Sequence, residues 1–441
     1  MFENLKIENW RQFSKLDIDF HPRLTVLTGV NGSGKTTVLN VLSECLGWKP
    51  VFVSSFNEQG NGKRKYGVSI NNEQIATISR DVPDGYYSFG ELKTKQNAER
   101  NELITFEDYA QKGTYSIHLN PEIEMKGVFI QSHRPTFPYR ELKTIPTSVA
   151  TRKQIYDRYH DFSISFARDE PRYSQVRDDS KYSNERDNSQ FTYGTLQFIS
   201  ATYLIKQDLA SLAIFGYGSS AVAPIPNAKA LFEGYCKILE SVLPQTLGFK
   251  RITVAMPEVI IETSTGNFPL DGISGGISSI IDITWQLYMF AEPGEPFVAL
   301  IDEPENHLHP ELQKSILGNL INTFPHVQFV VATHNPLIIS SQKDSHIYVL
   351  DYKDNKVHST LLDHINRAGT SSTILRDVLG LDTTIPLWAE EALNATIDKY
   401  RNISLSSDNL SRLRAELEQA GLQDYAPDAI AKVIEGDMES K

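Results

Sequence analysis

The chain has 441 residues, 40% of them hydrophobic and 22% charged, which is ordinary for a globular protein with a sizeable core and two lobes. Its formal net charge of −12 argues against a protein that coats nucleic acid over its whole surface, although local basic strips are compatible with it. The two cysteines lie far apart in the sequence, which excludes a disulfide scaffold and a cysteine-type zinc site. The chain shows neither a signal peptide nor a run approaching about 18 apolar residues, so we expect a cytoplasmic protein without membrane contact.

Short strands and a glycine-rich turn open the chain. Residues 2–9 and 15–20 alternate apolar and polar side chains, as half-buried strands do. The run 24-LTVLT-28 predicts a short buried strand. It leads into 29-GVNGSGKTT-37 and then into a segment that has apolar residues at helical spacing up to Trp48. We therefore expect a strand, a loop and a helix in that order.

The glycine-rich turn matches the phosphate-loop pattern Gly-x-x-x-x-Gly-Lys-Ser/Thr. Its glycines let backbone N–H groups converge on phosphate oxygens, and the helix N-terminus adds a favourable dipole. Lys35 can reach the β- and γ-phosphates, and Thr36 can bind Mg²⁺. A chance match is the alternative, and the strand before the turn and the helix after it weigh against one. We expect ATP to be bound by Asn31, Gly32, Ser33, Gly34, Lys35, Thr36 and Thr37.

The middle of the chain changes character twice. Short strands are predicted from about residue 50 to 125, and residues 147–245 are mostly helical. The polar stretch 169–190 interrupts the helical part and predicts a long loop. Strand patterns resume at 250–263, and the tail 370–441 is polar and helical.

Two buried strands are predicted at 297–302 and 328–334, with a helix at 311–324 between them. A strand–helix–strand pattern of this kind predicts parallel strands in an α/β sheet. Asp302 and Glu303 would then lie at the carboxyl edge of that sheet, where ligands bind. One carboxylate can hold Mg²⁺, and the next can activate a water for attack on the γ-phosphate.

Glu305, His307 and His309 crowd the residues that follow. A dedicated metal site on them is one interpretation, but their spacing matches no helical zinc motif and magnesium prefers oxygen ligands. The alternative is a structural turn before the next helix, with Pro310 in its first turn.

Taken in this order, the motifs resemble the nucleotide-binding domain of ABC-type ATPases of the SMC/RecF/OLD group. The phosphate loop resembles its Walker A motif, 297-FVALIDEPENHLHP-310 its Walker B motif and D-loop, and 330-VVATHNP-336 its H-switch strand, ending at His334. In 270-LDGISGGISS-279, Ser274, Gly275 and Gly276 resemble the signature motif, although Ile277 stands where the family has glutamine or a basic residue.

Two further residues enter through this resemblance. Arg11 lies in a segment that is similar to the first hairpin of the group and would approach the nucleotide. Gln131 resembles the Q-loop glutamine and would lie near Mg²⁺. A polar surface residue at a strand end is the alternative for Gln131.

The resemblance implies a slow ATPase whose subunits sandwich ATP head to tail in a dimer or a larger homo-oligomer. Lys35, Thr36 and Asp302 of one chain would face Ser274 and Gly276 of the other. Glu303 would act as the general base, His334 would contact the γ-phosphate, and a single chain would hydrolyse ATP poorly.

The expected fold class is α/β, an ABC-type mixed sheet with a P-loop, an inserted mainly helical lobe and a short helical tail. We divide the chain into an N-terminal ATPase part (1–145), the inserted lobe (146–248), a C-terminal ATPase part (249–365) and the tail (366–441).

The chain is too short for coiled-coil arms or for a whole Toprim nuclease module after His334, so Asp351 and Asp354 fit a surface turn better than a nuclease centre. The segments 301-IDEPENHLHPELQ-313 and 324-FPHVQFVVATHNPLIISS-341, followed by a short helical tail with 374-ILRDVLGLD-382, look most like the ATPase subunit of Septu-type antiphage systems. That resemblance implies a small HNH-type nuclease as partner, with the tail as either its docking site or a simple cap on the core. The alternatives are a RecF-like repair clamp that contacts DNA, for which 134–143 and 168–186 offer some positive charge, and an ATP-binding scaffold with negligible turnover.

Overall fold

The computed structural model describes residues 1–58, 64–67, 86–95, 101–106, 113–134, 139–146, 148–167, 201–362, 374, 387–401, 406–427, 429–431 and 433. The chain divides into two compact units, Met1–Ile374 and Leu375–Lys441, and each is described by itself. The predicted loop 169–190 lies outside the described residues.

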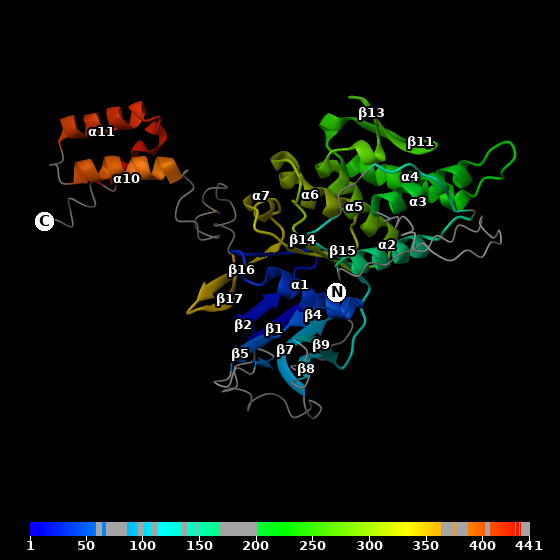
Figure 1. Cartoon of the computed structure of the whole chain (residues 1–441), viewed down its shortest axis with the longest axis horizontal. Helices are drawn as coiled ribbons and strands as arrows, with labels where there is room; N and C mark the ends of the chain where they lie inside the picture. The colour runs from blue at the N-terminus through cyan, green and yellow to red at the C-terminus, as the bar shows by residue number, and fades with distance from the viewer. Residues whose placement is uncertain are drawn as a thin grey trace, which may run out of the picture. The chain divides into compact units, whose positions relative to one another are not determined.

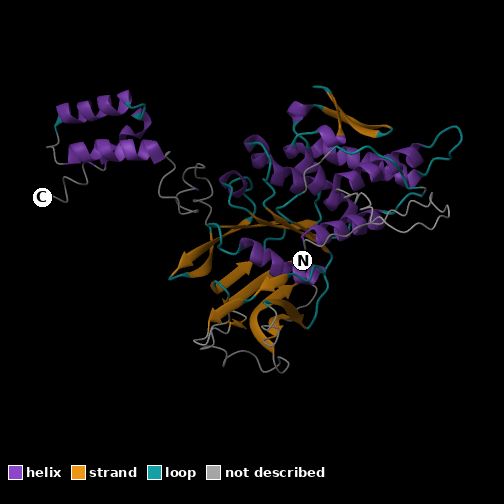
Figure 2. Cartoon of the chain, viewed as in Figure 1, coloured by secondary structure: helices purple, strands orange, loops and turns teal. Residues whose placement is uncertain are grey.

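A mixed sheet dominates the first unit (Figures 1 and 2). Its strands are β1 (Phe2–Trp10), β2 (Phe13–Asp19), β3 (Leu24–Thr28), β4 (Val51–Val53), β7 (Tyr86–Thr94), β8 (Asn101–Phe106), β9 (Thr114–Asn120), β10 (Gly127–Ile130), β14 (Phe297–Asp302), β15 (Val327–Ala332), β16 (His346–Lys353) and β17 (Lys356–Leu361). They are ordered β10-β14-β15-β3-β16-β17-β2-β1-β7-β8-β9-β4, and β5 (Ser55–Glu58) pairs with β6 (Arg64–Gly67) separately.

The two halves of the sheet differ in strand direction. Strands β10, β14, β15, β3 and β16 are parallel neighbours, whereas β2, β1, β7, β8 and β9 pair antiparallel. Every residue of β3, β14 and β15 is buried, as is usual for parallel strands covered on both faces. The predicted α/β class with a mixed sheet is therefore confirmed.

Helix α1 (Lys35–Ser43) is enclosed between the two halves of the sheet (Figure 1). Its Val38 and Leu42 belong to one buried cluster with Val298 and Leu300 of β14 and with Trp10 of β1. Burying such aliphatic and aromatic side chains contributes roughly 1.5–3 kcal/mol each. The start of α1, and with it the loop that precedes it, is thus anchored from both sides.

The remaining helices of this unit are α2 (Arg152–Ala167), α3 (Ala201–Tyr217), α4 (Pro226–Val242), α5 (Gly275–Phe290), α6 (Pro310–Thr323) and α7 (Pro336–Ile339). Helices α2 and α4 contact α5, and α4 also contacts α6. Strands β11 (Phe249–Ala255), β12 (Glu258–Thr263) and β13 (Asn267–Pro269) form their own antiparallel sheet, and its first two strands contact α3.

The second unit contains α10 (Leu387–Arg401) and α11 (Ser407–Gln419), which share a small core that includes Leu393, Ile397 and Leu413. Helices were predicted for this tail and are present. The four-part division of the chain stays a prediction. Within the described ranges, no helix has the length and apolar character that crossing a membrane requires.

Candidate nucleotide site

The phosphate loop, residues 29–37, connects β3 to α1 and depends on glycine. Gly29, Gly32 and Gly34 have φ values of 138°, 82° and 95°, in a region that side chains disfavour. A Cβ atom on Gly34 would lie 2.4 Å from Gln12 Nε2 and 2.5 Å from the Phe13 ring. The turn between β1 and β2 therefore packs directly against the loop, and glycine alone allows that approach.

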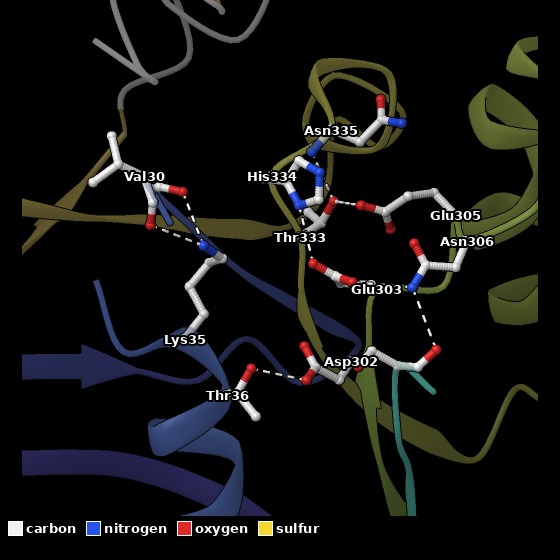
Figure 3. A network of polar contacts seen from close by, with 12 residues as sticks. Val30, Lys35, Thr36, Asp302, Glu303, Glu305, Asn306, Thr333, His334 and Asn335 are labelled. Carbon is white, nitrogen blue, oxygen red and sulfur yellow. Dashed lines mark hydrogen bonds and ion pairs between the residues drawn. The ribbon is translucent and has the colours of Figure 1, made fainter. Parts of the chain in front are cut away.

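Lys35 lies inside this loop. Its side chain is buried, and Nζ donates hydrogen bonds to the carbonyl oxygens of Gly29 and Val30 at 2.9 and 3.1 Å (Figure 3). Burial lowers the pKa of Lys35, while the nearby carboxylates of Glu303 and Asp302 counteract that effect. An ammonium group has three donors, so Lys35 can bind phosphate oxygens at the mouth of the loop.

Thr36 and Asp302 meet across the site. Thr36 Oγ1 donates a hydrogen bond to Asp302 Oδ2 at 2.8 Å, from the first turn of α1 to the end of β14 (Figure 3). Burial raises the pKa of Asp302, and the bond from Thr36 counteracts this. Gln131 follows β10, whose Ile130 pairs with Ile301, so it lies at the same sheet edge. The three predicted magnesium ligands thus share one edge, and hydroxyl, carboxylate and amide oxygens suit Mg²⁺.

Contacts of both its backbone and its side chain fix the position of Glu303. Its backbone adopts a left-handed φ of 48°, and its N–H donates to the Ala332 carbonyl at 2.9 Å. Its Oε1 lies 3.1 Å from His334 Nδ1, and its Oε2 accepts a hydrogen bond from Asn306 Nδ2 at 3.0 Å (Figure 3). The carbonyl of Glu303 accepts from Arg134 Nη2 at 2.9 Å. A carboxylate held in this way beside Asp302 can accept a proton from a water molecule.

The turn after β15 places His334. Asp302 pairs with Ala332 in adjacent parallel strands, so both strands end at the same level. The Thr333 hydroxyl donates a hydrogen bond to Glu305 and accepts one from the Asn335 N–H at 2.9 Å. His334 is half-exposed between these two anchored neighbours, which leaves its ring accessible beside Glu303.

Glu305 and His309 have different partners. Glu305 is 4% exposed and binds Thr333, and burial raises its pKa. His309 caps α6, with its Nδ1 3.4 Å from the Glu311 N–H, and Pro310 follows in the first turn. In the part of the chain that the structure describes, no group of three His, Cys, Asp or Glu side chains is placed to hold a metal ion. The geometry is that of a structural turn.

The signature-like segment packs against this same turn. Ser274 is the N-cap of α5, and both Ser274 and Gly275 are exposed. A Cβ atom on Gly276 would lie 2.9 Å from the His307 carbonyl oxygen. The start of α5 therefore presents an exposed serine and glycine next to the turn that follows Glu303.

Arg11 lies beside two aromatic rings, and its approach to the nucleotide stays a prediction. Its guanidinium lies 5.8 Å from the Trp10 ring centroid and 5.7 Å from that of Phe52, and it is Gln12 that faces Gly34. Tyr352 of β16 donates a hydrogen bond to the Gly32 carbonyl at 3.0 Å.

The sequence missed Gln12, Arg134, Asn306, Thr333 and Tyr352. Arg134 belongs to the basic segment 134–143, whose sequence predicts only positive charge.

Two protein families match parts of this chain. An AAA domain family matches residues 4–215, and a second AAA domain family, whose description names the AbiEii toxin of type IV toxin–antitoxin systems, matches residues 252–340. The "Retron Vc95 probable ATPase" of Vibrio cholerae is 23% identical over 443 residues, covering 91% of this chain and 82% of that protein.

A second similar protein matches a shorter segment of this chain, and one solved structure is similar at lower identity. "Septu protein PtuA" of Bacillus thuringiensis is 28% identical over 165 residues, and the match covers 34% of this chain and 42% of that protein. The SMC head domain from Thermotoga maritima is a structural neighbour with 14% identity and a TM-score of 0.39, covering 82% of this chain and 99% of that one.

Proposed function

We propose that this chain binds ATP, hydrolyses it slowly and thereby controls a partner nuclease in an antiphage defence complex of the cytoplasm. The premise is that the chain carries an SMC/RecF-like ABC-type ATPase domain and is related to the retron and Septu ATPases. The observation that carries the proposal is the convergence of Lys35, Thr36, Asp302 and Glu303 at one sheet edge.

The phosphates of ATP would lie in the phosphate loop, where backbone N–H groups and Lys35 bind them. Thr36 and Asp302, with Gln131 beside them, would hold magnesium, which neutralises phosphate charge and orients the reacting groups. Glu303 would orient a water molecule and take its proton. His334, next to Glu303, would donate to the γ-phosphate.

A second copy of the chain would complete the site. Ser274 and Gly276 start a helix whose N-terminus is exposed, so its dipole and N–H groups can face the ATP of another subunit. The assembly would be head to tail, and binding of ATP would favour its closure. Single chains would hydrolyse ATP slowly, because half of the charge-stabilising donors come from the partner.

The partner would be a small nuclease of HNH type, by analogy with the Septu systems that the chain resembles. The tail, residues 366–441, is the candidate docking region, because α10 and α11 form a compact unit of their own and Trp388 on α10 is 65% exposed.

The test is affinity purification of the tagged Glu303→Gln chain from its native host, followed by mass spectrometry of the proteins that co-elute. A tagged Lys35→Ala chain serves as the control that does not trap ATP. Recovery of a small nuclease at near-stoichiometric amount, reduced in the control, supports the proposal. Recovery of DNA and recombination proteins without a nuclease contradicts it and favours the repair clamp.

A further inference from the structure

Arg134 joins the ends of two parallel strands. Its Nη2 donates to the Glu303 carbonyl at 2.9 Å, and its Nη1 donates to the Gln131 carbonyl at 3.4 Å. Gln131 and Glu303 follow β10 and β14, which are adjacent in the sheet. One planar guanidinium therefore binds two backbone carbonyls at the ends of adjacent strands, and the Glu303 carbonyl also accepts a hydrogen bond from the Asn306 N–H at 3.2 Å.

The surroundings of Arg134 are built for a buried cation. Burial lowers the pKa of Arg134, and the carboxylates of Asp282 and Glu305 oppose that effect. Asp282 is 2% exposed on α5 and accepts a hydrogen bond from Gln286 at 3.0 Å, so its position is fixed. A buried charge is costly unless nearby acids and hydrogen bonds compensate for it. Here the acids act through their charge, Nη1 and Nη2 donate to carbonyls, and Nε is buried without a hydrogen-bond partner among the described residues.

Arg134 acts on a strained residue. Glu303 has a φ of 48°, which persists in a non-glycine residue only when its neighbours hold it. Its N–H donates to the Ala332 carbonyl, and its own carbonyl accepts from Arg134 Nη2 at 2.9 Å and, at the longer distance of 3.2 Å, from the Asn306 N–H. Asn306 adds a second link, since its Nδ2 lies 3.0 Å from Glu303 Oε2 and 3.3 Å from the Ser132 carbonyl.

We propose that Arg134 is the positioning residue of Glu303. Its hydrogen bond to the Glu303 carbonyl keeps the backbone of Glu303 in the left-handed conformation and keeps the Glu303 carboxylate beside His334. The inference rests on the proposed function, because it takes Glu303 as the group that activates water. Lysine at position 134 keeps the charge but lacks the planar fork that spans two carbonyls. Without this hydrogen bond the backbone of Glu303 can leave the left-handed conformation. Its carboxylate then moves away from the position in which it accepts a proton.

The experiment is a double-mutant cycle on the full chain, with Arg134→Lys, Glu303→Gln and the combined variant. Single-turnover ATP hydrolysis and the Kd for ATP are measured for each. Arg134→Lys is expected to slow hydrolysis by about 100-fold, as a misplacement of about 1 Å can do, with the Kd changed by less than about twofold. The combined variant is expected to hydrolyse ATP less than about twofold more slowly than Glu303→Gln alone, because Arg134 acts through Glu303.

Two controls keep the result interpretable. Arg251→Lys changes an arginine that is bound to Glu262 on the separate sheet, and it is expected to leave hydrolysis unchanged. If Arg134→Lys melts early, Arg134→Gln tests the same contact without the buried charge and is expected to be equally non-additive with Glu303→Gln.

An Arg134→Lys chain that hydrolyses ATP at the wild-type rate overturns the inference. So does an effect of equal size in the Glu303→Gln background. Both results leave the proposed function standing. A Glu303→Gln chain with the wild-type rate would overturn both.

Discussion

Replacing Gly34 with alanine should distort the phosphate loop and lower the free energy of unfolding, and the structure gives the size of that loss. Gly34 has a φ of 95°, and a left-handed backbone costs an L-residue roughly 1–2 kcal/mol. The added Cβ would also lie 2.5 Å from the Phe13 ring, which is fully buried and cannot move away. Overpacking of this kind costs about 1–3 kcal/mol. Together with the backbone cost, we expect the free energy of unfolding to fall by about 2–5 kcal/mol.

Gly47→Ala is the matched control for Gly34→Ala. Gly47 has a φ of 82°, but a Cβ atom there would meet no atom within 4 Å, so only the backbone cost of about 1–2 kcal/mol is expected. The assays are urea unfolding followed by tryptophan fluorescence and titration with a fluorescent ATP analogue. Gly34→Ala should be the less stable variant and should lose ATP affinity, whereas Gly47→Ala should keep it. Equal losses of stability in the two variants would refute the steric argument.

Three further predictions concern ATP affinity, the pH dependence of stability and assembly. Lys35→Ala should weaken ATP binding by about 10- to 100-fold in calorimetry, because a charged donor to phosphate is worth roughly 1.5–3 kcal/mol, and an unchanged Kd would contradict its role. Burial raises the pKa of Glu44 from 4.5 to about 7, so the folded state binds the extra proton and stability falls as pH rises through that window. Glu44→Gln should therefore be more stable than wild type at pH 8 by up to about 3 kcal/mol in urea unfolding, with little difference below pH 4.5, and the opposite trend would contradict the assignment. Ser274→Arg should leave ATP binding to single chains intact but abolish the ATP-induced increase in mass measured by light scattering; persistence of that increase would remove Ser274 from the interface.

Nearly continuous apolar runs predicted the parallel strands well, because strands covered on both faces bury almost only apolar side chains. The run 297–302 coincides with β14, and 328–334 overlaps β15. The helix after the phosphate loop is shorter than its apolar spacing suggested. It ends at Ser43 and tightens into a 3₁₀ turn, Glu44–Leu46, which Gly47 closes in a left-handed conformation.

Local motifs identify the residues that define the site, but not those that orient them. Lys35, Thr36, Asp302 and Glu303 stand in recognisable patterns, whereas the contact between Arg134 and Glu303 joins residues 169 positions apart. The partner of Thr333 is Glu305, 28 positions earlier, and no periodicity links them. Only the alignment of strand ends in the sheet brings such residues together.

The most direct test of the account is single-turnover ATP hydrolysis by the purified Glu303→Gln chain, measured together with its affinity for ATP in magnesium buffer. Glutamine keeps the size of the side chain but cannot accept a proton, and a general base contributes about 10²- to 10⁴-fold. We predict wild-type affinity, hydrolysis slowed by at least about 100-fold, and an ATP-bound assembly that persists on size-exclusion chromatography. Hydrolysis at the wild-type rate would contradict the assignment of Glu303 and the mechanism built on it.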